Sequence, residues 1–183
     1  MKSLFFRLAL AGAGLLTVQA GANAQLSKAI GSPFTATTLQ LSVAAILLLA
    51  VAVVTGSVAA FAALPEAHWW HVLGGTASAL YVVSTILLFP RLGAVVSVGL
   101  FIAGQMLASL VLDTFGLLGV PAGGFQAAAM AGTAIVLLGA TLIVLGQKGA
   151  VSELSWSKIG WMALALLAGA VLPIQGAINA LLA

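Results

Sequence analysis

The side chains of this chain that could contact a ligand inside a membrane are mostly amides. Its only two asparagines are Asn23 and Asn179, and each follows a glutamine by four residues, Gln19 and Gln175. Residues four apart lie on the same face of a helix. An amide in hydrocarbon has to find a hydrogen-bonding partner, so such a face either holds neighbouring helices together or lines a polar cavity. The sequence leaves both roles open.

The two amide pairs belong to one segment that occurs twice. Gln19-Ala-Gly-Ala-Asn23-Ala returns as Gln175-Gly-Ala-Ile-Asn179-Ala, and Leu16 and Leu172 match at the same offset of 156 residues. The rare Gln/Asn pair carries this match, because alanine and leucine coincide easily in an apolar chain. Five predicted crossings separate the copies, so the second enters the membrane in the opposite sense. Inverted repeats of this kind give many transporters access to both sides.

A second polar stripe is predicted on the fourth helix. Gln105, Ser109 and Asp113 follow one another at four-residue steps. Asp113 is the only acid in or near a predicted spanning segment, and intramembrane acids mark ion or proton pathways. About 33 Å of helix separates Arg91 from Asp113, so the acid can also lie at the interface and cap the turn that follows. Proton coupling and capping both stay open.

The third helix carries a face of small and polar residues. Gly74, Ser78, Tyr81 and Thr85 share it, and small residues let helices approach closely. Packing is the first interpretation of this face. If the face borders a cavity, Tyr81 is the residue expected to contact a ligand.

Several kinds of chemistry are not supported. His68 and His71 flank two tryptophans beside Glu66, but a metal site needs three or four converging ligands, so an interfacial aromatic belt is predicted. Cysteine is absent, and neither a Walker phosphate loop nor a Gly-x-Ser-x-Gly motif occurs. We therefore expect no metal, no cofactor and no enzymatic activity.

Composition places the chain in the lipid bilayer. It is 63% hydrophobic and 5% charged, whereas soluble domains carry about 25% charged residues. Its six Lys/Arg are scattered, so no nucleic-acid surface is expected. The sequence predicts an all-α polytopic transmembrane bundle with about six spanning helices. They are expected at 4–27, 34–64, 71–89, 92–111, 126–145 and 159–183, with a five-helix unit at 1–149 and a linker and first helix of a second, inverted unit at 150–183.

Some of these segments carry further expectations. The segment 34–64 is too long to stand upright across about 30 Å of hydrocarbon, so it should tilt or extend along the interface. Pro90-Arg91 predicts a tight joint, and Pro173 should loosen the last helix near Gln175.

Both ends of the chain need interpretation. The N-terminus imitates a secretory signal, with Lys2 and Arg7 before an apolar run and Ala22-Asn23-Ala24 as a cleavage site. The copy at 159–183 follows five other segments and cannot be a leader, so a retained helix is predicted. The abrupt C-terminus indicates a truncated or half-sized form of a longer, duplicated protein.

The order of short motifs is similar to that of a known family. They are Gln19…Asn23-Ala, Gly31-Ser-Pro33, Trp70-x-x-x-Gly74-Gly75, Pro90-Arg91-Leu-Gly93, Gly104-Gln105 and Leu112-Asp113-x-Phe115-Gly116. In this order they resemble YdcZ-like inner-membrane proteins of the drug/metabolite transporter superfamily. The resemblance implies five-helix units, used in pairs or fused in tandem, that export small molecules. One departure is Thr114, where the family often has histidine, which weakens an Asp–His proton relay.

The sequence therefore predicts a multi-pass secondary transporter, or the larger part of one, in a bacterial inner membrane. It would export a small organic solute by rocking one five-helix unit against an inverted partner. That partner is a second copy in a homodimer or a second repeat unit. The alternatives are a non-transporting assembly or accessory subunit and an incomplete fragment of a ten-helix transporter. The residues predicted to line the path are Gln19, Asn23, Tyr81, Gln105, Ser109, Gln175 and Asn179, with Asp113 as the coupling acid.

Overall fold

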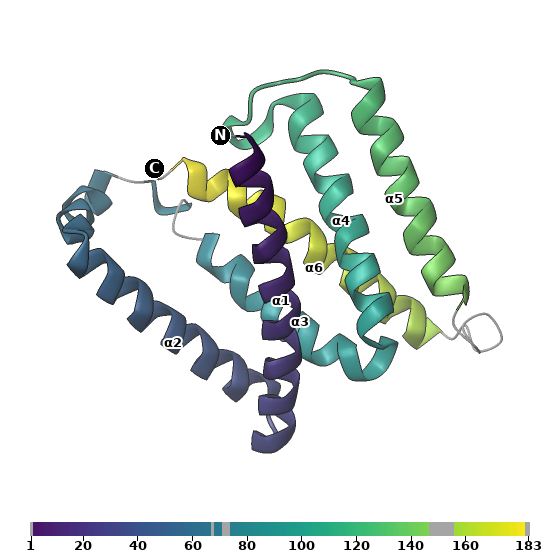
Figure 1. The fold of residues 1–183 in the computed structure, drawn as a ribbon, viewed down its shortest axis with the longest axis horizontal. Coiled ribbons are helices and arrows are strands. Elements are labelled where there is room, and N and C mark those ends of the chain that lie inside the picture. Colours follow the sequence, from purple (N-terminus) through teal and green to yellow (C-terminus); the bar gives the residue numbers. More distant parts are fainter. Residues whose placement is uncertain (1, 67, 71–73, 147–155, 182–183) are drawn as a thin grey trace.

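Six long helices make up most of the chain described by this computed structural model, which covers residues 2–66, 68–70, 74–146 and 156–181 (Figure 1). No β-strand occurs among these residues, so the predicted all-α bundle is confirmed. The α-helices are α1 (Lys2–Ile30), α2 (Pro33–Val54), α3 (Gly74–Leu92), α4 (Ala94–Phe115), α5 (Ala127–Gly146) and α6 (Trp156–Ala180). Two 3₁₀ helices, η1 (Ser57–Glu66) and η3 (Leu117–Gly119), lie in the connections.

Five of these helices, α2 to α6, are long and apolar enough to cross a membrane, judged over the described residues. The remaining long helix, α1, has 29 residues and exceeds the roughly 20 that a crossing requires. Five of the six predicted crossings are thus supported by length and composition, and that of α1 stays a prediction. The predicted boundary between two units, at residues 149 and 150, lies outside the described residues.

The predicted long second helix, 34–64, is wrong in its C-terminal third. Helix α2 ends at Val54, and the chain turns at Thr55 and Gly56 before it continues as η1. Gly56 has φ +72°, a conformation that glycine adopts without the steric cost of a side chain. The Thr55 hydroxyl lies 2.9 Å from that of Ser57 across the turn. Apolar composition alone did not reveal this break, because hydrophobic residues resume in η1 directly after Ser57.

The joint between the third and fourth helices also differs from the prediction. Helix α3 continues through Pro90 and Arg91 to Leu92, and the chain turns at Gly93, which has φ +81°. Pro90 lies in the last turn of α3, where it removes one backbone hydrogen bond but does not end the helix. Pro173 is likewise contained within α6, which runs without interruption to Ala180.

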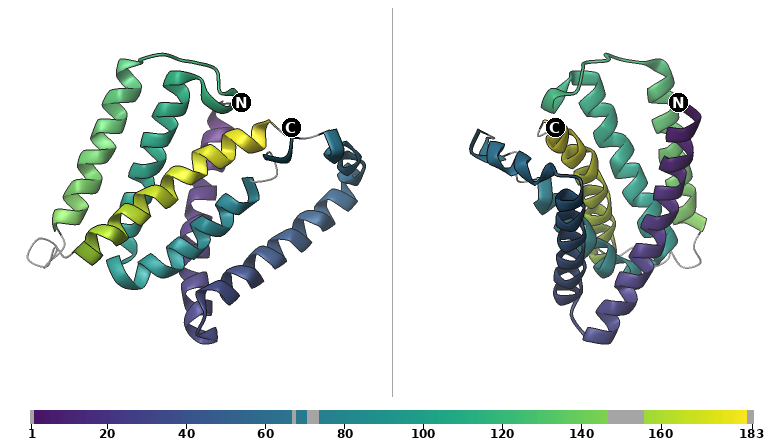
Figure 2. Two further views of the ribbon diagram at one scale, coloured as in Figure 1. Left: turned by 180° about the vertical axis from the view of Figure 1, so that it is seen from behind. Right: turned by 60° about the vertical axis from the view of Figure 1, so that its left-hand side comes forward.

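Helices α3 and α4 form the centre of the molecule. Helix α6 crosses both diagonally on one face, and α1 lies on the opposite face (Figures 1 and 2). Helix α5 packs beside α4, and α2 extends away on the other side and contacts α1 and α3. The two repeated segments run in opposite directions, since α1 descends in Figure 1 while α6 rises towards the C-terminus. This is the relative orientation that the inverted-repeat interpretation requires.

The closest helix packing joins α4 to α6. A Cβ atom added to Gly104 would overlap the backbone of Leu166, and one added to Gly169 would lie 2.7 Å from the Cα atom of Phe101. These two glycines therefore let the backbones meet directly, as small residues do in membrane helix pairs. The main buried cluster surrounds this crossing and comprises Leu88, Leu92, Val96, Leu100, Phe101, Ala165 and Ala168.

Candidate functional site

A cavity of about 270 Å³, here called the amide cavity, lies between α1, α2, α3 and α6. Its polar walls come from three helices: Gln19 and Asn23 of α1, Gln40 of α2, and Ser78, Tyr81 and Thr85 of α3. Its apolar walls include Leu16 of α1 and Leu172 of α6. These two leucines occupy equivalent positions of the internal repeat, so both copies of the repeated segment border the same cavity.

The Asn23 amide nitrogen donates a hydrogen bond to the side-chain oxygen of Gln40. Asn23 is buried, with 8% of its surface exposed, and this bond joins α1 to α2 at the cavity wall. Gln19 lies one turn earlier on α1 and is exposed beside the cavity. The first amide pair therefore has one residue bonded between helices and one residue open to the cavity.

The second amide pair faces α3. The Gln175 amide nitrogen donates to the Ser78 hydroxyl oxygen at 2.6 Å. One turn further along α6, the Asn179 side chain lies against Gly74, where an added Cβ would overlap it. The two contacts follow the antiparallel register of α3 and α6. Gln175 thus reaches the cavity wall through Ser78, while Asn179 lies beyond it and is exposed.

A second cavity of about 190 Å³, here called the Gln105 cavity, adjoins the first. It lies between α1, α3 and α4, and its one amide wall is Gln105. The two cavities share Leu16, Ala20 and Tyr81 as walls. The Tyr81 ring packs on Phe101 with centroids 5.2 Å apart. Tyr81 therefore stands between the two cavities, and a change in its rotamer would alter the space that joins them.

The rest of the fourth-helix stripe leads away from the Gln105 cavity. Ser109 is half-buried and is not a wall of either cavity. Asp113 is exposed and lies three residues before Gly116, which ends α4 in a left-handed conformation. Its backbone carbonyl accepts a hydrogen bond from Gly123 N at 2.7 Å. Within the described parts of the chain its carboxylate forms no hydrogen bond, so the predicted side-chain cap is not formed.

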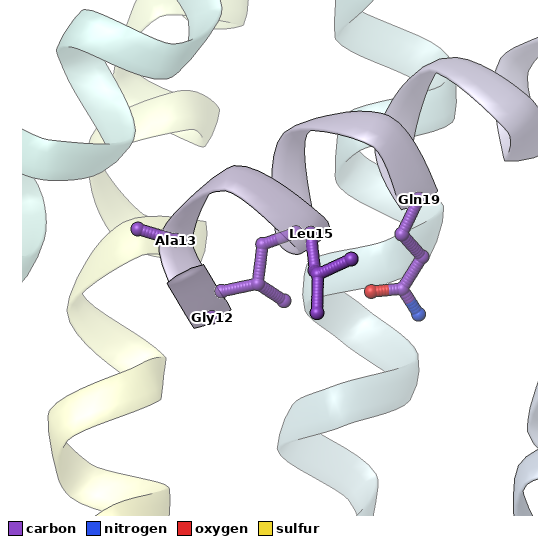
Figure 3. Close-up of a pocket in the computed structure, with 5 residues that line it drawn as sticks. Gly12, Ala13, Leu15 and Gln19 are labelled. Carbon is purple, nitrogen blue, oxygen red and sulfur yellow. The ribbon is translucent and has the colours of Figure 1, made fainter. Parts of the chain in front are cut away.

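A larger hollow of about 610 Å³ lies along α1, and all its walls belong to that helix. Figure 3 draws these wall residues and labels Gly12, Ala13, Leu15 and Gln19, which lie on neighbouring turns of α1. Only Gln19 among these is polar in its side chain. A hollow without an opposite wall does not enclose a solute, so the amide cavity is the better candidate despite its smaller volume.

Two polar wall residues of the amide cavity, Gln40 and Ser78, differ from the sequence-based prediction. Gln40 was not considered, although a glutamine in the apolar run of α2 is the same signal that identified Asn23. Ser78 was assigned to helix packing, and it does bind Gln175, but it also borders the cavity. Of the residues predicted to line the path, Gln19, Asn23 and Tyr81 border the amide cavity, Gln105 borders the adjoining cavity, and Ser109 and Asn179 lie outside both.

The described residues contain no cluster of three His, Cys, Asp or Glu side chains that could hold a metal ion. Trp69 is exposed and Trp70 half-buried, and the His68 ring lies 6.3 Å from that of Trp70. His71, the other predicted belt residue, lies outside the described residues. The described aromatic rings between η1 and α3 therefore lie close to one another in a largely exposed segment.

Comparison with known families identifies the chain. Residues 4–142, from α1 to near the end of α5, match the family described as "Putative inner membrane exporter, YdcZ". The chain belongs to this family. The YdcZ match contains every polar wall residue of both cavities, and α6 follows it. That α6 begins a second YdcZ unit stays a prediction.

No curated protein and no solved structure matches the chain. The family description supports a membrane exporter, and the five membrane-capable helices agree with it.

Proposed function

We propose that the chain forms the solute-binding part of a secondary transporter of the bacterial inner membrane. The observation that carries this proposal is the amide cavity, in which six polar side chains from three long apolar helices converge. A ligand pocket characteristically combines apolar walls with a few placed polar groups. A subunit that used its amides only to join helices would have no need for a cavity beside them.

The cargo that these walls suit is a small uncharged organic solute. Neither cavity has a charged side chain among its walls in the described part of the chain. An ion without a partner is costly to bring into such surroundings, whereas hydroxyl and amide groups find donors and acceptors on Gln19, Gln40 and Thr85. The volume of about 270 Å³ lies just below the usual range of drug-sized sites, which favours a small molecule.

Alternating access requires a second, inverted unit. In this proposal another copy of the chain supplies it as a homodimer, or a second repeat unit begins with α6. The shared wall made by Leu16 and Leu172 supports a cavity placed between repeat-related helices. Rocking one unit against the other would expose Gln19 and Gln40 to opposite sides in turn, and it would export the solute.

Water access to the cavity provides the first test. The chain contains no cysteine, so single cysteines can be introduced without background. Ala44→Cys, on the cavity wall of α2, is expected to react several times faster with a membrane-impermeant thiol reagent in proteoliposomes than Ala45→Cys. The reason is that only an aqueous environment ionises the thiol, and the thiolate is the reactive form.

Ala45 is a close control, because it lies about 1.5 Å further along the same helix and is also exposed but does not line the cavity. Equal slow labelling of both cysteines would mean a dry cavity. The chain would then be an assembly or accessory subunit whose amides only join helices.

Proton coupling through Asp113 is the second part of the proposal. The stripe from Gln105 to Asp113 spans about 12 Å of helix and leads from the second cavity to the end of α4. Asp113→Asn is expected to abolish accumulation of the solute driven by a pH gradient and to retain exchange without a gradient. Uptake into proteoliposomes, screened with uncharged solutes, measures both. Full gradient-driven accumulation by Asp113→Asn would remove the acid from the mechanism.

A further inference from the structure

Most polar walls of the amide cavity already take part in hydrogen bonds within the protein. Asn23 donates to Gln40, and Ser78 accepts from Gln175. The Thr85 hydroxyl donates to a backbone carbonyl of its own helix at 2.8 Å. These bonds use part of the capacity of each group, so a solute in the cavity has to share what remains.

Three polar walls have no hydrogen-bonding partner among the described residues. They are Gln19 in the amide cavity, Gln105 in the Gln105 cavity, and the Tyr81 hydroxyl, which borders both. Amide and hydroxyl groups both donate and accept, and leaving them unbonded among apolar walls is costly. They are therefore the groups that a bound solute is best placed to satisfy. Since Gln19 and Gln105 border different cavities, one molecule reaches both amides only if it extends from one cavity into the other.

The two cavities meet where α1 crosses α3 (Figure 1). Their shared walls belong to these two helices alone, Leu16 and Ala20 on α1 and Tyr81 on α3. From this junction the amide cavity extends along α1 towards Asn23, and the Gln105 cavity extends along it towards the N-terminus. In the described structure α1 packs on α2 and α3 but not closely on α4, so the second cavity occupies the space between α1 and α4. The cavities are thus two compartments on either side of one helix crossing.

The junction between the cavities is apolar apart from one hydroxyl. Leu16, Ala20 and the ring of Tyr81 line it, and the walls of the Gln105 cavity other than Tyr81 and Gln105 are also apolar. A polar group placed at the junction would lose its hydration and find one hydroxyl at most, whereas an apolar chain or ring loses nothing there. A molecule that passes through the junction should therefore be apolar in its middle and polar at its ends.

We propose that the cargo of this site is an elongated, uncharged solute with a hydrogen-bonding group at each end and an apolar section between them. One end bonds to Gln19, the other end bonds to Gln105, and the apolar section lies at the junction against Ala20 and the Tyr81 ring. A solute that occupies both cavities falls within the usual volume of ligand sites, about 300–1,000 Å³. This inference rests on the proposed transport function, and it narrows the cargo from small uncharged solutes in general to those with two polar ends.

Binding of linear diamides by the purified chain in detergent tests the proposal. The probes are succinamide, adipamide and suberamide, which carry an amide group at each end, and each is compared with the monoamide of the same chain length. Equilibrium dialysis of the radiolabelled compounds measures the dissociation constants. The diamide of suitable length is expected to bind about threefold to tenfold more tightly than its monoamide, which is the contribution of one further hydrogen bond. Because its second amide is better hydrated than a methyl group, an apolar cavity without a polar partner would favour the monoamide instead.

Substitutions at the two ends and at the junction should each remove the preference for the diamide. Gln19→Leu and Gln105→Leu leave one end of the diamide without a partner, and Ala20→Leu fills the junction between the cavities. In each variant the diamide is expected to bind no more tightly than the monoamide. Gln25→Leu and Ala22→Leu are the matched controls, because they make the same changes at exposed positions of α1 that line neither cavity. Both controls are expected to keep the wild-type preference, and thermal unfolding of every variant checks that it is folded.

The outcomes separate this inference from the proposed function. Equal binding of diamide and monoamide, weakened by Gln19→Leu and not by Gln105→Leu, would overturn the two-ended solute and leave the amide cavity as the site of a smaller one. An equal loss of preference in Gln25→Leu would also overturn it. If neither kind of amide binds at any length, the uncharged cargo of the proposed function fails together with this inference.

Discussion

Gly169→Val is expected to separate α6 from α4 and to leave little folded protein. The new side chain would overlap the backbone of Phe101 on α4, where even a Cβ atom lies 2.7 Å from the Phe101 Cα. Backbone cannot move aside as a flexible side chain can, so the helices must part and break the contacts of the buried cluster around Phe101. Overpacking commonly costs about 1–3 kcal/mol, and this backbone overlap places the variant at or above that range. Thermal unfolding in detergent, followed by size-exclusion chromatography, measures the loss.

Gly176→Val is the control, because it makes the same chemical change two turns later on the same helix. A Cβ atom at Gly176 meets nothing within 4 Å. Any cost that valine brings to a helix in general is therefore common to both variants, and only the crossing differs. If the two variants unfold at the same temperature, the close approach of α4 and α6 does not contribute to stability.

Sequence predicted the helices well because long apolar runs between short polar joints leave few alternatives in a membrane. The failures occurred where one residue decides between helix and turn. Thr55, Gly56 and Ser57 interrupt the apolar run at the end of α2, but hydrophobic residues resume directly after them, so the segment was predicted as one helix. Pro90 was predicted to form a joint, but α3 continues past it to Leu92 and the chain turns at Gly93, which has φ +81°.

The candidate site was less predictable, for a different physical reason. Spacing places Gln19 with Asn23, and Gln175 with Asn179, on common helix faces, but it does not say which helix each face meets. Asn23 binds Gln40 of α2, whereas Gln175 binds Ser78 of α3. The repeated pair thus has different partners in its two copies. Partners on other helices depend on how the helices pack, which the spacing within one helix does not determine.

The hydrogen bond between Asn23 and Gln40 gives the sharpest distinction between structural and transport roles. Asn23→Leu alone, or Gln40→Leu alone, leaves one amide at the cavity wall without its partner. Each is expected to lower the free energy of unfolding by about 1–3 kcal/mol, whereas replacing both partners by apolar residues can be nearly neutral. The double variant should therefore unfold close to the wild-type temperature.

Transport is expected to respond differently. In the double variant, uptake of an uncharged solute into proteoliposomes should fall about fivefold or more, because loss of the polar partners for one or two hydrogen bonds removes about 1–3 kcal/mol of binding. Thermal unfolding and uptake on the same preparation separate the two roles. If the two amides only join α1 to α2, the apolar pair should restore both stability and uptake. If the amides bind the solute, the apolar pair should restore stability but not uptake. A double variant that unfolds near the wild-type temperature and transports poorly would therefore place Asn23 and Gln40 in the transport path.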